Sequence, residues 1–95
     1  MSGQRFEISH SSSRIYDAQL PQQQAAIHAS LANFLANKNP DSLLHDESDL
    51  PEGIEPPRGR DVFFFWGEED WIIFVQKRSP AYYIVGLRKI GQSHE

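Results

Sequence analysis

The sequence contains no cysteine among its 95 residues, and this absence excludes several classes of protein. Without thiols the chain has no disulfide framework, no thiolate metal site and no cysteine nucleophile. It also has no apolar run longer than five residues, whereas a membrane-spanning helix needs about 20. The polar stretch 1–13 does not resemble a signal peptide. We therefore expect a cytoplasmic protein with no membrane partner.

Known catalytic and cofactor-binding motifs are also missing. The chain has no phosphate-binding or dinucleotide-binding glycine loop, no zinc-protease helix and no nucleophile elbow. Its four histidines are scattered, with no pair three or four residues apart. The acidic stretch 41–55 lacks the ligand spacing of a calcium loop. We therefore expect no metal and no cofactor.

Basic residues are fewer than acidic ones, at 9 against 13, and the net charge is −4. This balance disfavours a general attraction to nucleic acid or anionic lipid. The charge is unevenly distributed, because residues 1–57 carry −5 and residues 58–95 carry +1. Six of the acids lie in 41–55, which has no lysine or arginine. The C-terminal part can therefore still present a basic patch.

The pattern of apolar residues predicts a single α+β domain over residues 1–95. Polar and apolar residues alternate in 4–9, which is typical of a short half-buried strand. The serines of 10–13 are candidate N-caps for a short helix that ends near Pro21. The clearest helix is Gln22–Asn37. Its apolar positions recur at i, i+4, i+7 and i+8: Ile27, Leu31, Phe34 and Leu35.

Three strands are predicted in the second half of the chain, after a long connection at 41–60 that is rich in acids and prolines. They are Asp61–Trp66, Trp71–Gln76 and Ala81–Ile90, each rich in aromatic and β-branched residues. Short polar connectors between them predict a three-stranded antiparallel meander. The connection carries four apolar anchors, so we expect it to lie against the body: Leu43, Leu44, Leu50 and Ile54.

The predicted strands are apolar on both faces. In the second strand Trp71, Ile73 and Val75 point one way, and the residues between them point the other way. In the third strand we expect Tyr82 and Ile84 on one side, and the other side to hold Tyr83, Val85 and Leu87. One helical layer covers only one face. We expect a partner chain or a second copy to cover the other, with Trp71 and Ile73 in that contact; the alternative is that loop 41–60 closes it.

Basic and aromatic residues gather near the ends of the predicted strands, a mixture that can hold phosphates and stack bases. The alternative is that the charges mark strand ends and the aromatic residues form the core. The candidate RNA-binding residues are Arg58, Lys77, Arg78, Tyr82 and Lys89. In the acidic stretch, Asp46, Glu47 and Asp49 are candidates for docking on a basic partner, and a solvated loop is the alternative.

The order of elements resembles that of the RelE/ParE-type toxins of bacterial toxin–antitoxin pairs. Leu20-Pro21, followed by the apolar positions of 26–35, is similar to the helix hairpin of that family, and 50–53 before 59–65 resembles its passage from loop into strand. The resemblance implies an endoribonuclease that cuts ribosome-bound mRNA, or a gyrase poison, neutralised by an antitoxin. Carried onto this sequence, the catalytic positions are Arg60 (or Arg58), Arg88 and His94.

Two other functions remain open. The main alternative is a non-enzymatic inhibitor or immunity-type protein that docks on a basic partner through residues 41–55. A phage gene is one origin that we consider for such a protein. A structural subunit or adaptor that forms a homo-oligomer is the third. A toxin would act on RNA or the ribosome, whereas the other two would bind only protein.

Overall fold

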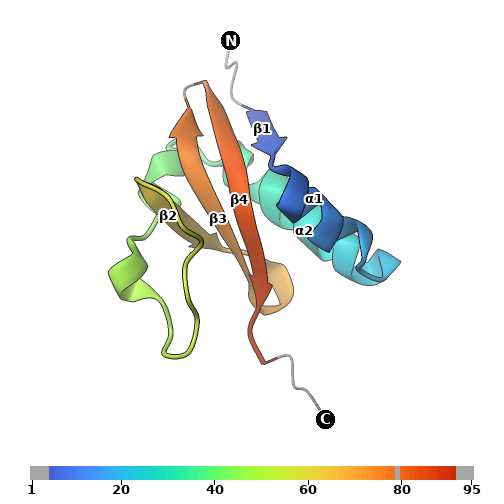
Figure 1. Cartoon of the computed structure of the whole chain (residues 1–95). Helices are drawn as coiled ribbons and strands as arrows, with labels where there is room; N and C mark the ends of the chain where they lie inside the picture. Colours follow the sequence, from blue (N-terminus) through green and yellow to red (C-terminus); the bar gives the residue numbers. More distant parts are fainter. Residues whose placement is uncertain (1–4, 79, 92–95) are drawn as a thin grey trace.

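A four-stranded mixed sheet and two helices form the body of the protein (Figure 1). The computed structural model describes residues 5–78 and 80–91. The helices are α1 (His10–Asp17) and α2 (Pro21–Ala36). The strands are β1 (Arg5–Ile8), β2 (Val62–Trp66), β3 (Trp71–Arg78) and β4 (Ala81–Lys89). Three short 3₁₀ turns join them: η1 (Pro40–Leu43), η2 (Glu47–Asp49) and η3 (Glu68–Asp70).

The strand order in the sheet is β1-β4-β3-β2. The antiparallel pairing of β2 with β3 and of β3 with β4 confirms the predicted meander. The prediction was incomplete, however, because β1 joins the sheet as a parallel neighbour of β4, with Phe6 opposite Tyr82. A hydrogen bond of 2.9 Å from the Ser9 amide to the Ile84 carbonyl extends this pairing. The sheet is therefore mixed.

Local sequence explains where both helices begin. The Ser9 hydroxyl caps α1 by accepting a 3.1 Å hydrogen bond from the Ser12 amide, so the cap lies two residues before the first of the predicted serines. Helix α2 begins at Pro21, where the missing N–H of proline has no helical partner to lose. It ends at Ala36, with Asn37 as its C-cap. Neither helix is long and apolar enough to cross a membrane within the described ranges.

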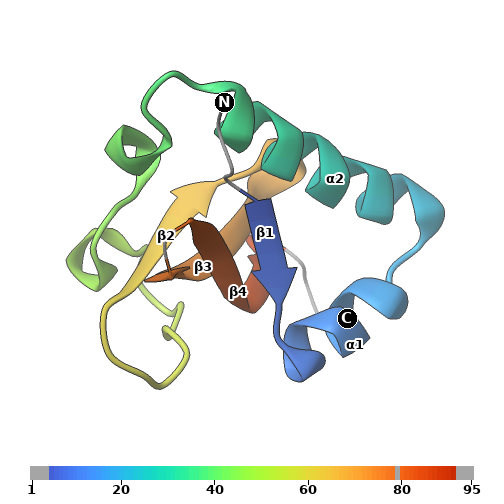
Figure 2. The same cartoon turned by 90° about the horizontal axis from the view of Figure 1, so that it is seen from above.

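One face of the sheet packs against α2 (Figure 2). The predicted stripe of α2 is confirmed, since Ile27 and Phe34 are buried against the sheet. The Phe34 ring stacks on the Phe65 ring with the centroids 4.1 Å apart. Trp71 and Ile73 are only 2% and 0% exposed in this core. The prediction that they contact a partner chain is therefore wrong, because the chain's own helix covers them.

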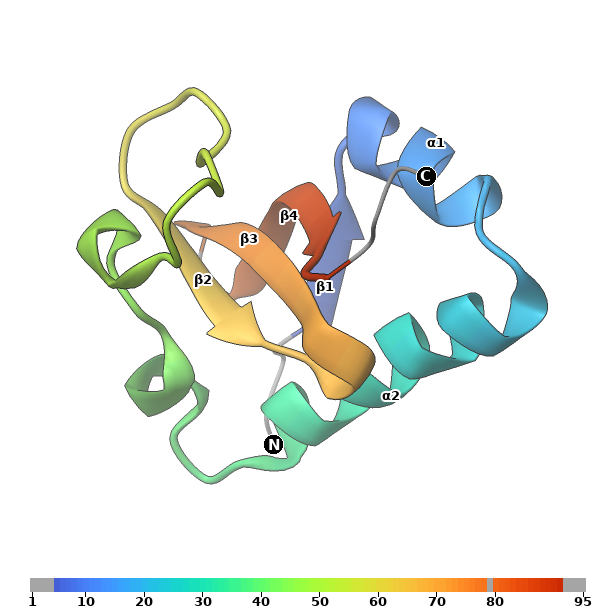
Figure 3. The ribbon, with the colours of Figure 1, turned by 90° about the horizontal axis from the view of Figure 1, so that it is seen from below.

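The start of the connection 41–60 lies on the α2 side, where Leu43 and Leu44 pack on the first cluster. Its later part covers the opposite face, on the far side of β2 and β3 from α2 (Figure 3). Leu50 and Ile54 pack there against the second buried cluster, which consists of Val62, Phe64, Ile72 and Phe74. An isolated antiparallel bridge fixes the connection to the sheet edge, through hydrogen bonds of 2.8 and 3.0 Å between His45 and Phe64. The alternative in which this loop covers the second face is therefore the one observed.

A bulge in β4 changes the side of the sheet on which Leu87 lies, so one further prediction is wrong. Phe74 lies opposite Gly86 and Val75 opposite Ile84, so Val85 is an extra residue in the ladder. Such an insertion reverses the alternation of side chains beyond it. Leu87 therefore joins the α2 side of the core instead of the predicted opposite side.

Candidate binding surface

The two candidate catalytic arginines that the structure describes lie toward opposite ends of β3. The Arg60 carbonyl accepts a 3.0 Å hydrogen bond from Gln76. Arg88 instead lies opposite Ile72 in the ladder. These two positions of β3 are four residues apart, which is about 13 Å along a strand. His94, the third candidate, lies outside the described residues.

The candidate RNA-binding residues do not form one surface. Lys77 lies over the Phe63 ring at 5.7 Å, and Arg78 lies over the Tyr83 ring at 4.2 Å. Because Lys77 and Arg78 are adjacent in β3, they point to opposite faces of the sheet. Arg58 is exposed in the connection before β2. Lys89 lies near the other end of β3 and donates to the Glu69 carbonyl.

Tyr82 is not available for base stacking, because it is 4% exposed in the core. Its hydroxyl donates a 2.6 Å hydrogen bond to Asp41 Oδ1. Burial first, and then this hydrogen bond and the charge of Asp41, raise the pKa of Tyr82 to about 12. The prediction that Tyr82 binds RNA is therefore wrong: its side chain holds η1 against the sheet.

The predicted acidic docking residues lie together on η2. Asp46, Glu47 and Asp49 are all exposed, and we call them the acidic loop surface. His45 Nδ1 lies 3.6 Å from Asp49, whereas no ion pair between described residues involves Asp46 or Glu47. A shallow pocket of ≈ 330 Å³ separates this surface from the start of β2. No group of three or more histidine and acidic side chains in the described part of the chain could hold a metal ion.

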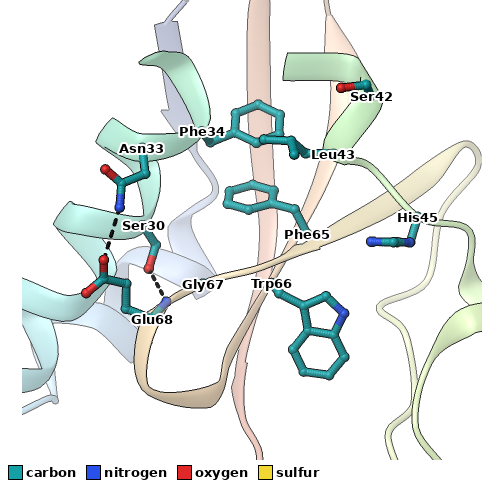
Figure 4. Close-up of a pocket in the computed structure, with 10 residues that line it drawn as sticks. All are labelled: Ser30, Asn33, Phe34, Ser42, Leu43, His45, Phe65, Trp66, Gly67 and Glu68. Carbon is teal, nitrogen blue, oxygen red and sulfur yellow. Dashed lines mark hydrogen bonds between the residues drawn. The ribbon is translucent and has the colours of Figure 1, made fainter. Parts of the chain in front are cut away.

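A second acidic group lies in the turn between β2 and β3, which the sequence indicated only as a polar connector. Both Glu69 and Asp70 have positive φ, at 55° and 66°, and such strain persists only where surrounding contacts hold it. Helix α2 supplies those contacts. The Glu68 amide donates a 2.7 Å hydrogen bond to Ser30 Oγ, and Asn33 Nδ2 donates a 3.0 Å bond to Glu68 Oε2 (Figure 4).

A pocket of ≈ 530 Å³ opens between this turn, α2 and η1. We call it the Trp66 pocket, after the tryptophan that is 46% exposed at its edge. Figure 4 shows Phe34, Leu43 and Phe65 on one side, His45 on another and Trp66 on a third. This pocket was not predicted from the sequence, because Trp66 was expected only as the last residue of an apolar strand. The run of acids directly after it, Glu68 to Asp70, was the available signal.

No protein-family model matches the chain, and no curated protein matches it either.

Proposed function

We propose that this protein is a non-enzymatic binding protein that docks on a basic partner protein through its acidic connection, residues 41–55. The observation that carries the proposal is that two carboxylates at η2 are exposed and form no ion pair with a described residue. Asp46 and Glu47 are exposed, and no ion pair among the described residues neutralises them. Such a surface accelerates encounter with a positively charged partner and selects against acidic ones.

The rigidity of the connection supports the same function. The hydrogen bonds between His45 and Phe64 fix the chain just before η2, and Leu50 packs on the core just after it. The carboxylates are therefore presented from a fixed backbone, which reduces the entropy lost on binding.

The proposal is tested with the product of a neighbouring gene as the candidate partner. Asp46→Lys combined with Glu47→Lys should abolish its co-purification. The matched control, Glu7→Lys combined with Asp17→Lys, changes the net charge equally on β1 and α1 and should leave binding intact. Equal retention of the partner by both double variants contradicts the proposal.

A RelE/ParE-like toxin that acts on translation or on gyrase is the second candidate. The observation that favours it is the order of elements, one strand and two helices before three antiparallel strands, with Arg60 and Arg88 both exposed. Such a protein would be an mRNA endoribonuclease in its translational form, and an antitoxin would neutralise it. Expression alone should then arrest growth, and Arg60→Ala or Arg88→Ala should relieve the arrest. Normal growth at full expression removes this candidate.

A further inference from the structure

The two outer strands of the sheet differ in how the chain covers them. Strand β2 forms one edge, and the bridge between His45 and Phe64 occupies part of it through two backbone hydrogen bonds. Strand β1 forms the other edge, and no described segment pairs with its outer side. An unpaired edge presents backbone donors and acceptors that can bind a further strand. The outer side of β1 is therefore a candidate interface.

The pairing of β1 with β4 decides which backbone groups of β1 are available. The Ser9 amide donates to the Ile84 carbonyl, and Ile8 is the residue opposite Ile84. Backbone groups along a strand point alternately to its two sides, so Arg5 and Glu7 bond to β4 in the same way as Ser9. Phe6 and Ile8 therefore direct both their N–H and C=O groups away from the sheet.

The side chains of Phe6 and Ile8 give this edge an apolar surface. Phe6 packs in the core beside α2, and Ile8, two residues later, lies on the same face and is 43% exposed. An apolar cleft of ≈ 360 Å³ continues from them between the two helices, and its lining includes Tyr16, Ile27 and Leu31. A strand added to β1 would place its own apolar side chains at the entrance of this cleft.

The charges of β1 select the strand that fits. Arg5 and Glu7 lie on the face opposite Phe6 and form an exposed 3.0 Å ion pair. In an antiparallel pair, residues whose backbone groups point outward must lie opposite one another. Pairing Phe6 with Phe6 of a second copy meets this condition and places Arg5 of each copy opposite Glu7 of the other. Pairing Phe6 with Ile8 would instead place Glu7 opposite Glu7, which is destabilising.

We propose that β1 binds β1 of a second copy of this chain, antiparallel and about a two-fold axis at Phe6. The two sheets then join into one, with the Phe6 rings adjacent on the helix-covered face and two Arg5–Glu7 pairs on the other face. This inference goes beyond the proposed function and does not depend on it, because the acidic loop surface lies beside β2, at the other edge of the sheet.

Sedimentation equilibrium tests the association. The average mass should rise with concentration from 10.9 kDa towards twice that value. Arg5→Glu turns both symmetric attractions into repulsions and should weaken dimerisation at least about tenfold. Arg14→Glu, the same charge change on the exposed side of α1, should alter it less than about twofold. A single-chain mass at all concentrations up to about 1 mM overturns the inference, and so do equal effects of the two variants.

A charge exchange separates the specific register from diffuse electrostatics. Glu7→Arg should also weaken dimerisation, although it lowers the net negative charge of each copy. A mixture of the Arg5→Glu and Glu7→Arg variants should form a heterodimer, because each then carries the charges that complement the other. The double variant Arg5→Glu/Glu7→Arg should again associate with itself. Failure of both the mixture and the double variant to associate overturns the register.

Hydrogen exchange locates the interface on the backbone. The Phe6 amide should exchange slowly in the wild-type dimer and rapidly in Arg5→Glu, whereas the Glu7 amide, bonded to β4, should be slow in both. A dimer in which the Phe6 amide exchanges rapidly uses another surface and overturns the inference. An unchanged circular dichroism spectrum of Arg5→Glu shows that the fold is retained.

The proposed function and this inference fail separately. Asp46→Lys/Glu47→Lys should release the basic partner and keep the dimer, whereas Arg5→Glu should release the second copy. A dimer that is lost with the loop double variant and kept with Arg5→Glu contradicts the assignment to β1.

Discussion

The hydroxyl of Tyr82, in the central strand β4, donates a 2.6 Å hydrogen bond to the carboxylate of Asp41 at the start of the long connection. The other oxygen of the same carboxylate lies 3.4 Å from Lys77 Nζ. These two contacts attach η1 to the helix-covered side of the sheet. The remainder of the connection then continues to the opposite side, where it covers the second apolar cluster.

Stability should fall between pH 10 and pH 12 because of Tyr82. Its pKa rises from 10.0 in the unfolded chain to about 12 in the folded protein. Below pH 10 the phenol is protonated in both states; between these values only the unfolded state loses the proton, so rising pH favours unfolding. The measurement is urea unfolding across this range for the wild type and Tyr82→Phe. A difference between them that does not change with pH contradicts the prediction.

Tyr82→Phe should also destabilise the protein at pH 7, by about 1–2 kcal/mol, because it removes a hydrogen bond to a charged acceptor and keeps the buried ring. Tyr83→Phe is the matched control. The Tyr83 ring lies beneath Arg78 and is only half-buried, so we expect a change below about 0.5 kcal/mol. Chemical denaturation of both variants checks this. An equal cost would show that the bond to Asp41 has no special role.

Gly67→Ala should destabilise the β2–β3 turn, because a Cβ at this position would lie 2.5 Å from Ser30 Oγ and 2.9 Å from Ser30 Cβ. We expect a cost of about 1–3 kcal/mol, since neighbouring backbone has to move. The test is a double-mutant cycle in urea with Ser30→Gly, which removes both clashing atoms. In that background the cost of Gly67→Ala should shrink. Strict additivity of the two changes would refute the close approach as the cause.

Removing the anchors of the connection should expose the second face of the sheet. Leu50→Ala combined with Ile54→Ala takes away side chains that pack on Phe64 and Phe74. We expect a loss of about 2–4 kcal/mol, binding of a hydrophobic dye and self-association in light scattering. The control is Leu20→Ala, at a position 66% exposed, which should change stability by less than about 0.5 kcal/mol. A double variant that stays monomeric and binds no dye would contradict this role.

Much of the fold followed from local patterns. The stripe of α2, the antiparallel meander and the anchoring role of Leu50 and Ile54 were predicted, because each depends on periodicity or on turn residues close in sequence. The parallel pairing of β1 with β4 was not, since it joins segments more than 70 residues apart. The reversal at Leu87 was missed because a single extra residue, Val85, changes the side of the sheet without a strong sequence signal.

The candidate surfaces, like the fold, were only partly predictable from the sequence. The sequence alone determined the chemistry of the chain: its apolar strands, its acidic connection and its lack of thiols follow from residue types. Only the tertiary structure decided which of these groups are accessible. Burial and proximity depend on contacts between distant segments, so Tyr82 and Trp71 became core residues, whereas Trp66 and Glu68 came together at a pocket.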